Sequence, residues 1–269
     1  MTELRKITLY TDVHPGNGPF LLLVHGFLSG RSQWGPNLEA LSRVCRPVVV
    51  ELWGHGRSPS PDDAALYHPD AYVEAFEQLR QELGAARWFI CGQSLGGALT
   101  LRYSLTYPER LLAQIFTNSN AGLADAAWIA ARRTSALQQA EAIEQNGYDA
   151  LEELPVHPIR SRRLPAEAKA ALLEDAALHD PCGIARTLRY TTLNAPVAER
   201  VRDIRVPTLL VCGERERRFA PRRVFAEREI PGLKVVGAEA GHAVNIEAAE
   251  VFNRAAVDFI RRLESGHVR

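Results

Sequence analysis

The sequence lacks an excess of either charge. Lysine and arginine together number 32, and aspartate and glutamate together number 32, so the formal net charge at pH 7 is zero. Proteins that bind nucleic acids usually carry a basic surplus, because cationic side chains hold the phosphate backbone. We therefore expect no nucleic-acid partner.

Long apolar runs are also missing. The densest ones, such as Phe20–Val24, are far shorter than the roughly 20 residues that a membrane-spanning helix needs. The opening stretch, Met1–Tyr10, is polar and strand-like and has no apolar core of the signal-peptide kind. These absences predict no membrane partner and a cytoplasmic location.

Cysteine is scarce, and its spacing excludes the common metal and redox motifs. The chain has four cysteines, and no two of them form a CxxC pair of the kind found in zinc sites and thioredoxin-like enzymes. Cys91 and Cys212 lie inside apolar runs, where we expect them to be small buried hydrophobic residues. We expect neither a metal ion nor an organic cofactor.

Short apolar runs alternate with helical patterns in the first half of the chain and again near its end. A run that is apolar on both faces is typical of a buried parallel strand, and alternation with helices indicates an α/β fold. The expected strands are Phe20–Val24, Pro47–Leu52, Arg87–Cys91, Leu111–Phe116, Pro207–Cys212 and Lys234–Val236, and the expected helices are Asp70–Leu83, Leu95–Tyr107 and Ile246–Leu263.

The segment 121–200 has a different pattern. Strand-like runs vanish there, and helix-forming residues, chiefly Ala, Leu, Glu, Gln and Arg, are interrupted by Gly147 and several prolines. The sequence therefore predicts an α/β fold with a mostly parallel central sheet flanked by helices. Residues 1–120 and 201–269 form the predicted core, and residues 121–200 form a predicted helical cap inserted into it.

A G-x-S-x-G pentapeptide, Gly92–Gly96, stands between an expected strand and an expected helix. This is the setting of a nucleophile elbow, in which a sharp turn exposes the central serine at the sheet edge, above a helix N-terminus. The glycines allow neighbouring backbone to pack closely. We identify Ser94 as the candidate nucleophile; the alternative is that Ser94 only caps the helix.

A serine hydroxyl needs a base to accept its proton and an acid to orient that base. His242 follows the last short strand, precedes the final helix and stands behind Gly241, which favours it over the other histidines as the base. The acid should follow the strand that ends at Cys212. Glu216 occupies the expected position, and Glu214 is the alternative. The interpretation without a catalytic role is a charge run exposed to solvent.

The oxyanion formed by attack on a carbonyl needs preorganised donors. The backbone N–H groups of Leu95, directly after the serine, and of Phe27, in the loop after the first expected strand, are the candidates. Four side chains are candidates for the substrate pocket: Trp34, Arg132, Arg189 and Phe219. These arginines, together with Arg133 and Arg218, are candidates to bind a substrate carboxylate, the alternative being that they face solvent on exposed helices.

The chain resembles the α/β-hydrolase superfamily over nearly its whole length. The matching motifs are His25-Gly26-Phe27, Glu51–Ser58, Gly92–Gly97, Gly213–Glu216 and Gly241-His242. Within the superfamily it is similar to two branches. One contains the menaquinone-pathway succinyl-hydroxycyclohexadiene-carboxylate synthases, and the other contains the β-ketoadipate enol-lactonases and related ester and C–C hydrolases. The resemblance implies a triad of serine, acid and histidine in the chain order of this superfamily.

One position departs from the synthase branch. That branch usually has an arginine directly after its S-x-G-G motif, where it binds the substrate carboxylate, and this chain has Ala98. We therefore expect a serine hydrolase that cleaves a small carboxylic ester, a lactone or a related carbonyl compound through an acyl-enzyme. The alternatives are a lyase of the synthase type, a C–C bond hydrolase, or a ligand-binding module on the same scaffold. The expected partner is a small-molecule substrate. The sequence carries no signal for one oligomeric state over another.

Overall fold

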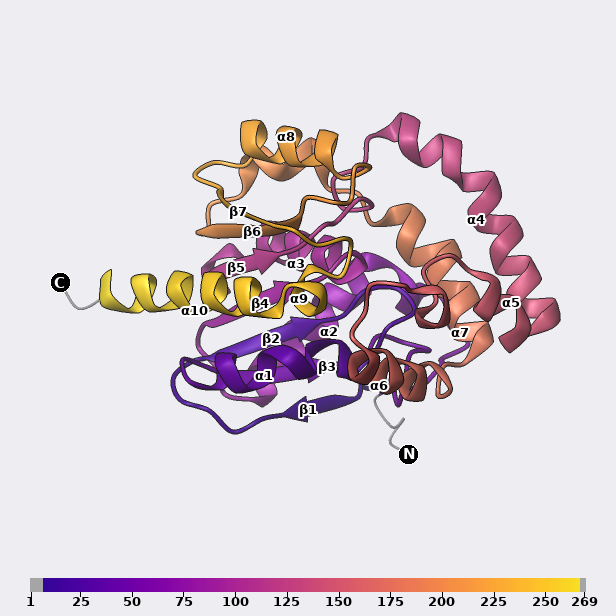
Figure 1. Cartoon of the computed structure of the whole chain (residues 1–269), viewed down its shortest axis with the longest axis horizontal. Helices are drawn as coiled ribbons and strands as arrows, with labels where there is room; N and C mark the ends of the chain where they lie inside the picture. Colours follow the sequence, from indigo (N-terminus) through magenta and orange to yellow (C-terminus); the bar gives the residue numbers. More distant parts are fainter. Residues whose placement is uncertain (1–6, 267–269) are drawn as a thin grey trace, which may run out of the picture.

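A computed structural model describes residues 7–266 (Figure 1). Its strands are β1 (Thr11–Val13), β2 (Phe20–Val24), β3 (Arg46–Val50), β4 (Trp88–Gly92), β5 (Leu111–Phe116), β6 (Thr208–Gly213) and β7 (Lys234–Ala238). They form one sheet in the order β1-β3-β2-β4-β5-β6-β7. β1 pairs antiparallel with β3, and every other neighbouring pair is parallel.

Helices cover both faces of this sheet. They are α1 (Gly35–Ser42), α2 (Pro69–Glu82), α3 (Leu95–Thr106), α8 (Ala220–Glu229), α9 (Val244–Glu247) and α10 (Ala249–Gly266). Successive side chains of a strand point to opposite faces, so a strand that is buried on both faces is apolar throughout. In β2, Leu22 and Val24 pack in one core with side chains of α2 and α3, whereas Leu21 and Leu23 pack in a second core with α1 and α10. The predicted fold class, a mostly parallel sheet flanked by helices, is confirmed.

The chain between β5 and β6, residues 117–207, contains helices only, and we call it the helical segment. Its elements are α4 (Ala126–Asn146), α5 (Tyr148–Glu153), η4 (Pro158–Arg160), α6 (Ala166–Ala176), α7 (Pro181–Arg186), η5 (Thr187–Thr191), η6 (Thr192–Asn194) and η7 (Ala198–Asp203). Figure 1 shows α4 to α7 gathered at the end of the molecule opposite the free end of α10. The predicted division into a core and a cap at residues 121 and 200 stays a prediction.

Polar contacts tie the helical segment to the loop that follows β3. Nη1 of Arg57 lies 3.0 Å from Oδ1 of Asp175, in α6, and 3.0 Å from Oε1 of Glu51, at the end of β3. The amide of Gly56 donates to Nδ1 of His179 at 2.9 Å. These contacts fix the position of α6 and the loop after it against the sheet.

The structure departs from the predicted elements near the chain's C-terminal end. The single helix expected over Ile246–Leu263 is two helices, α9 and α10, because Ala248 has φ −133° and ψ 52° and interrupts the helical path. The strand β1 was not predicted, since three residues are too few to show a periodic pattern. Cys91 and Cys212 are buried, as expected. No helix within residues 7–266 is long and apolar enough to cross a membrane.

Candidate active site

Ser94 stands at a sharp turn between β4 and α3. β4 ends at Gly92 and α3 begins at Leu95, and between them Ser94 has φ 52° and ψ −110°. A positive φ is rare for a residue with a side chain, costs about 1–3 kcal/mol and persists only where the surroundings enforce it. The Ser94 side chain makes no capping hydrogen bond to α3, so the alternative of a simple helix cap is wrong. It lines a cavity instead.

Two glycines allow this turn to pack against its neighbours. A Cβ atom on Gly96 would lie 2.1 Å from the carbonyl oxygen of Val24, at the end of β2, and one on Gly92 would lie 2.3 Å from the carbonyl oxygen of Gly96. Both distances are far below any real contact, and the atoms met belong to backbone, which cannot move aside cheaply. Only glycine therefore fits at these positions of the pentapeptide.

Side chains from two other loops hold the turn. Oγ of Ser119, in the loop after β5, donates to the carbonyl of Ser94 at 2.7 Å. Nε2 of Gln93 donates to the carbonyl of His242 at 3.1 Å, which joins the serine turn to the histidine loop. In the described part of the chain no hydrogen bond joins Oγ of Ser94 to the His242 ring, although both line the same cavity. Such bonds are often long without substrate and tighten when it binds.

His242 and Glu216 form a hydrogen-bonded pair at this cavity. His242 lies between β7 and α9, and Glu216 lies in the loop after β6. Nδ1 of the imidazole donates to Oε2 of Glu216 at 2.8 Å. Burial alone raises the pKa of this carboxyl, but the hydrogen bond and charge of His242, with hydrogen bonds from Asn118 and Asn120, hold it below its ordinary value. The acid is therefore ionised and oriented toward the ring.

The alternative acid, Glu214, has a different partner. Its Oε1 accepts a hydrogen bond from Nη1 of Arg223 at 2.9 Å, and about half of its side chain is exposed. It does not line the cavity that holds Ser94. Of the two candidates left open by the sequence, the structure therefore brings Glu216 and not Glu214 to His242.

The two predicted oxyanion donors, Phe27 and Leu95, both line the cavity. The amides on either side of Phe27 are occupied: Gly26 donates to Oε1 of Gln33 at 3.0 Å, and Leu28 donates to Nε2 of His55 at 3.3 Å. Within residues 7–266 the amides of Phe27 and Leu95 donate to no protein acceptor. Leu95 is the first residue of α3, where an N–H has no partner inside the helix. Both donors are thus free to bind a substrate oxygen.

His25 supports the loop that carries Phe27 and takes no place in the cavity. It is fully buried, its Nδ1 donates to the carbonyl of Gly26 at 2.7 Å, and its Nε2 accepts from the amide of Leu52 at 3.0 Å. One ring nitrogen donates and the other accepts, so the imidazole is neutral. Burial lowers its pKa, which is consistent with that state. These contacts hold the loop that carries Phe27 in one position.

The cavity has a volume of about 750 Å³ and lies where the loops after β2, β4, β6 and β7 meet the helical segment. Its wall is largely apolar, with polar groups gathered near Ser94. Side chains of the helical segment that contribute to it include Trp128, Arg132, Leu154, Val156, Leu164, Leu172 and Leu188. A cavity of this size and composition is typical of a small-molecule site.

Only one of the four predicted pocket side chains lines this cavity, and the other three must be corrected. Arg132 lines it, with its guanidinium 4.5 Å from the centre of the Trp128 ring, and so does Arg218. The other three side chains are occupied elsewhere. Trp34 is buried against Phe252, Phe219 is buried in the core, and Arg189 forms an ion pair with Glu144 at 2.7 Å.

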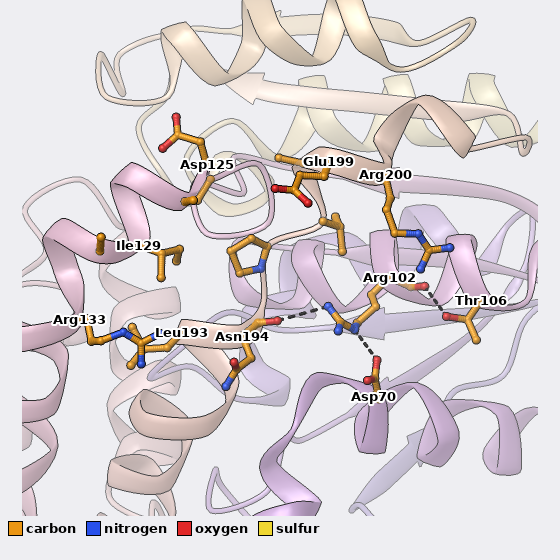
Figure 2. Close-up of a pocket in the computed structure, with 16 residues that line it drawn as sticks. Asp70, Arg102, Thr106, Asp125, Ile129, Arg133, Leu193, Asn194, Glu199 and Arg200 are labelled. Atoms are coloured by element: carbon orange, nitrogen blue, oxygen red, sulfur yellow. Dashed lines mark hydrogen bonds and ion pairs between the residues drawn. The ribbon is translucent and has the colours of Figure 1, made fainter.

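A second cavity of about 610 Å³ lies between α3, the start of α4 and residues 193–200 (Figure 2). Arg133 lines this cavity. Inside it, Arg102 donates to Oδ1 of Asp70 at 2.5 Å and to the carbonyl of Asn194 at 3.3 Å. The second cavity contains none of the three candidate catalytic side chains, so the prediction that Arg133 reads a substrate at Ser94 is not supported.

Two site residues were missed by the sequence analysis, Asn118 and Asn120. Nδ2 of Asn118 lies 2.6 Å from Oε2 of Glu216, and Nδ2 of Asn120 lies 2.8 Å from Oε1. A signal for them was present, because a run of polar residues, Thr117–Asn120, directly follows a buried parallel strand at the edge where active sites form. Within residues 7–266 no three His, Cys, Asp or Glu side chains are grouped to hold a metal ion.

Comparison with known proteins identifies the family to which this fold belongs. A family model described as the alpha/beta hydrolase fold matches residues 19–249. A Bacillus subtilis (strain 168) protein provisionally named 2-succinyl-6-hydroxy-2,4-cyclohexadiene-1-carboxylate synthase is 23% identical over 256 residues, 93% of each chain. Carboxylesterase YbfK of the same organism is 26% identical over 260 residues, 91% of this chain and 81% of that one. The enol-lactonase structure from Burkholderia xenovorans LB400 has a TM-score of 0.79, 23% identity and coverage of 94% and 96%.

Proposed function

The chain belongs to the alpha/beta hydrolase fold family, and we propose that within this family it is a serine hydrolase of small carboxylic esters, lactones or related carbonyl compounds. The observation that carries the proposal is the placement of Ser94 at a positive φ on the wall of a cavity that also holds the His242–Glu216 pair. A strained serine on a cavity wall, beside an imidazole oriented by a carboxylate, is the arrangement that activates a hydroxyl for attack. The similarity to a carboxylesterase over 91% of the chain supports the same class of reaction.

The proposed reaction has two stages. Oγ of Ser94 attacks the substrate carbonyl while Nε2 of His242 accepts its proton, and the amides of Phe27 and Leu95 bind the resulting oxyanion. The imidazolium, stabilised by Glu216, then gives that proton to the leaving alcohol, and the C–O bond breaks. Water attacks the acyl-enzyme with His242 again as base, and Ser94 is released with the acid product.

Covalent labelling tests the nucleophile directly. A fluorophosphonate probe should label the wild-type protein at Ser94 and should not label Ser94→Ala, which should also lose hydrolysis of a short acyl ester. Ser265→Ala, at an exposed serine of α10, is the matched control and should keep both properties. Full esterase activity in Ser94→Ala, or labelling at another serine, would show that the proposal is wrong.

A second candidate is supported by the two arginines of the cavity. Arg132 and Arg218 line it, and neither forms an ion pair with a carboxylate of residues 7–266. A substrate that carries a carboxylate would satisfy both, as in the lyase reaction of the synthase branch or in C–C bond hydrolysis. Ala98, which stands where the synthases carry an arginine, is fully buried and does not line the cavity, and this favours hydrolysis. Pyruvate release from the menaquinone-pathway intermediate, measured beside ester turnover, separates the two candidates.

A further inference from the structure

A glutamate in the acid position of the triad presents a mechanical problem. Its side chain has one more rotatable bond than aspartate, so its carboxylate samples more orientations and loses more conformational freedom when it is held. Nδ1 of His242 nevertheless donates to Oε2 of Glu216 at 2.8 Å. Something must therefore restrict the carboxylate, and the loop after β5 supplies the restraint.

Asn118 binds the same carboxylate oxygen as the histidine. Its side chain is fully buried, and its Nδ2 donates to Oε2 of Glu216 at 2.6 Å. The orientation of its amide is determined by a neighbour, because Oδ1 accepts the backbone N–H of Gly213 at 3.0 Å, and only the oxygen of an amide can accept. The NH₂ group therefore faces Glu216.

Asn120 binds the other oxygen. Its Nδ2 donates to Oε1 of Glu216 at 2.8 Å, and the residue is half-buried on the wall of the cavity. The carboxylate therefore accepts three hydrogen bonds: Oε2 accepts from the imidazole and from Asn118, and Oε1 accepts from Asn120. A carboxylate bound at both oxygens cannot rotate about its last bond without breaking at least one of these contacts.

The residue between the two asparagines serves the nucleophile. Oγ of Ser119 donates to the carbonyl of Ser94 at 2.7 Å. Three consecutive residues after β5 therefore contact both Glu216 and the serine turn. This short stretch of backbone couples the position of the acid to the position of the serine.

We propose that Asn118 and Asn120 are positioning residues that clamp the Glu216 carboxylate so that it can orient His242. This inference rests on the proposed function, because it gives the pair a role in the serine-hydrolase reaction. The clamp also favours the ionised acid, since each amide donates a hydrogen bond that a neutral carboxyl accepts less well.

Asn120 is the better position for a test, because it is only half-buried. In Asn120→Leu the amide is lost at similar volume, and kcat for a short acyl ester should fall about tenfold with KM within twofold, as expected when an orienting partner is removed. In Asn120→Asp a second carboxylate lies beside Glu216, so the acid limb of the kcat/KM profile should move up by about one pH unit, because added negative charge favours the imidazolium. Asn17→Asp, at an exposed residue before β2, is the charge-matched control and should change neither quantity.

Asn118→Asp repeats the test at the buried position, with thermal unfolding monitored to show that the variant is folded. Wild-type kcat and an unshifted pH profile in both Asn120 variants would overturn the clamp, and so would a rise in KM alone, which would make Asn120 a substrate contact. Fluorophosphonate labelling of Ser94 separates failure of the clamp from failure of the proposed function. If the probe labels Ser94 in every variant, the hydrolase proposal stands whatever the asparagines do.

Discussion

Nδ1 of His242 lies 2.8 Å from Oε2 of Glu216, although the acid is a glutamate and follows β6 within a run of charged residues. The neighbouring acid, Glu214, is held by Arg223 and does not reach the ring. Position along the loop, rather than the chemical type of the acid, therefore decides which carboxylate serves the histidine. Hydrogen bonds from Asn118 and Asn120 hold the Glu216 carboxylate in this position.

The first prediction concerns these two acids. Glu216→Gln should lower kcat for a short acyl ester by about 10⁴, as loss of the orienting acid does in serine triads, because the imidazole loses its partner for the charged state. Glu214→Gln, the matched control two residues away, should keep kcat within twofold. Steady-state kinetics on both variants decide the point. A large loss in Glu214→Gln with an active Glu216→Gln would reverse the assignment.

The second prediction concerns the close packing of the serine turn. Gly96→Ala places a methyl group 2.1 Å from the carbonyl of Val24, and the backbone must shift to relieve it. We expect the free energy of unfolding to fall by about 3 kcal/mol and esterase activity to be lost, because the shift moves Ser94. Gly35→Ala is the control, since a Cβ there meets nothing within 4 Å. Urea denaturation compares the two, and equal stability of both variants would contradict the packing argument.

The predicted site residues that the structure brings to one cavity share a local signal. Ser94 and His242 each stand in the loop that follows a strand, near glycines. Parallel strands bring their carboxyl ends to one edge of a sheet, so these loops lie close together in space. Phe27 follows the same rule after β2. For these positions the sequence pattern and the topology are sufficient.

The pocket residues were less predictable, because each depends on which face of an element points to the cavity. Trp34 follows β2 closely but turns toward Phe252 of α10, and Arg189 turns toward Glu144 of α4. Such choices are set by packing between segments far apart in the sequence, which no local pattern records. The polar run Thr117–Asn120 was a local signal for Asn118 and Asn120, but their pairing with Glu216, almost 100 residues later, is recorded in no local pattern.

The third prediction concerns a buried ion pair away from the cavity. Glu77 of α2 accepts hydrogen bonds from Arg80 and from Tyr103 of α3, and those from Arg80 chiefly lower its pKa to about 2. Because folding lowers this pKa, the ionised Glu77 stabilises the folded protein at pH values above about 4.5, the ordinary pKa of a glutamate. This stabilisation is lost as the pH falls toward 2. Glu77→Gln should therefore lower the free energy of unfolding at pH 7 by about 3 kcal/mol, and by about half as much at pH 3. Glu39→Gln, at an exposed pair, is the control. A difference between wild type and Glu77→Gln that does not change with pH would contradict the prediction.

The fourth prediction concerns three buried histidines that join the helical segment to the core. The rings of His25 and His55, and of His55 and His179, have centroids 5.2 Å apart, and all three are buried. Burial is the main cause that lowers the pKa of each, to about 3 for His179. Below about pH 6.5 these histidines therefore bind protons in the unfolded chain but remain neutral in the folded chain.

The sign follows from that difference in proton uptake. The free energy of unfolding should fall as pH drops from 6.5 toward 3, by up to about 1.4 kcal/mol per pH unit for each ring. His179→Asn keeps an acceptor for the Gly56 amide but cannot be protonated, so its slope should be smaller by about that amount. His68→Asn, at an exposed ring, is the control and should leave the slope unchanged. Urea denaturation at pH 7, 6 and 5 measures the slopes, and an equal slope in wild type and His179→Asn would show that this ring is protonated in the folded protein. The charged His179 ring would then repel its neighbour His55 and weaken the hold on the loop that carries Phe27, because Nε2 of His55 accepts the Leu28 amide only in the neutral state.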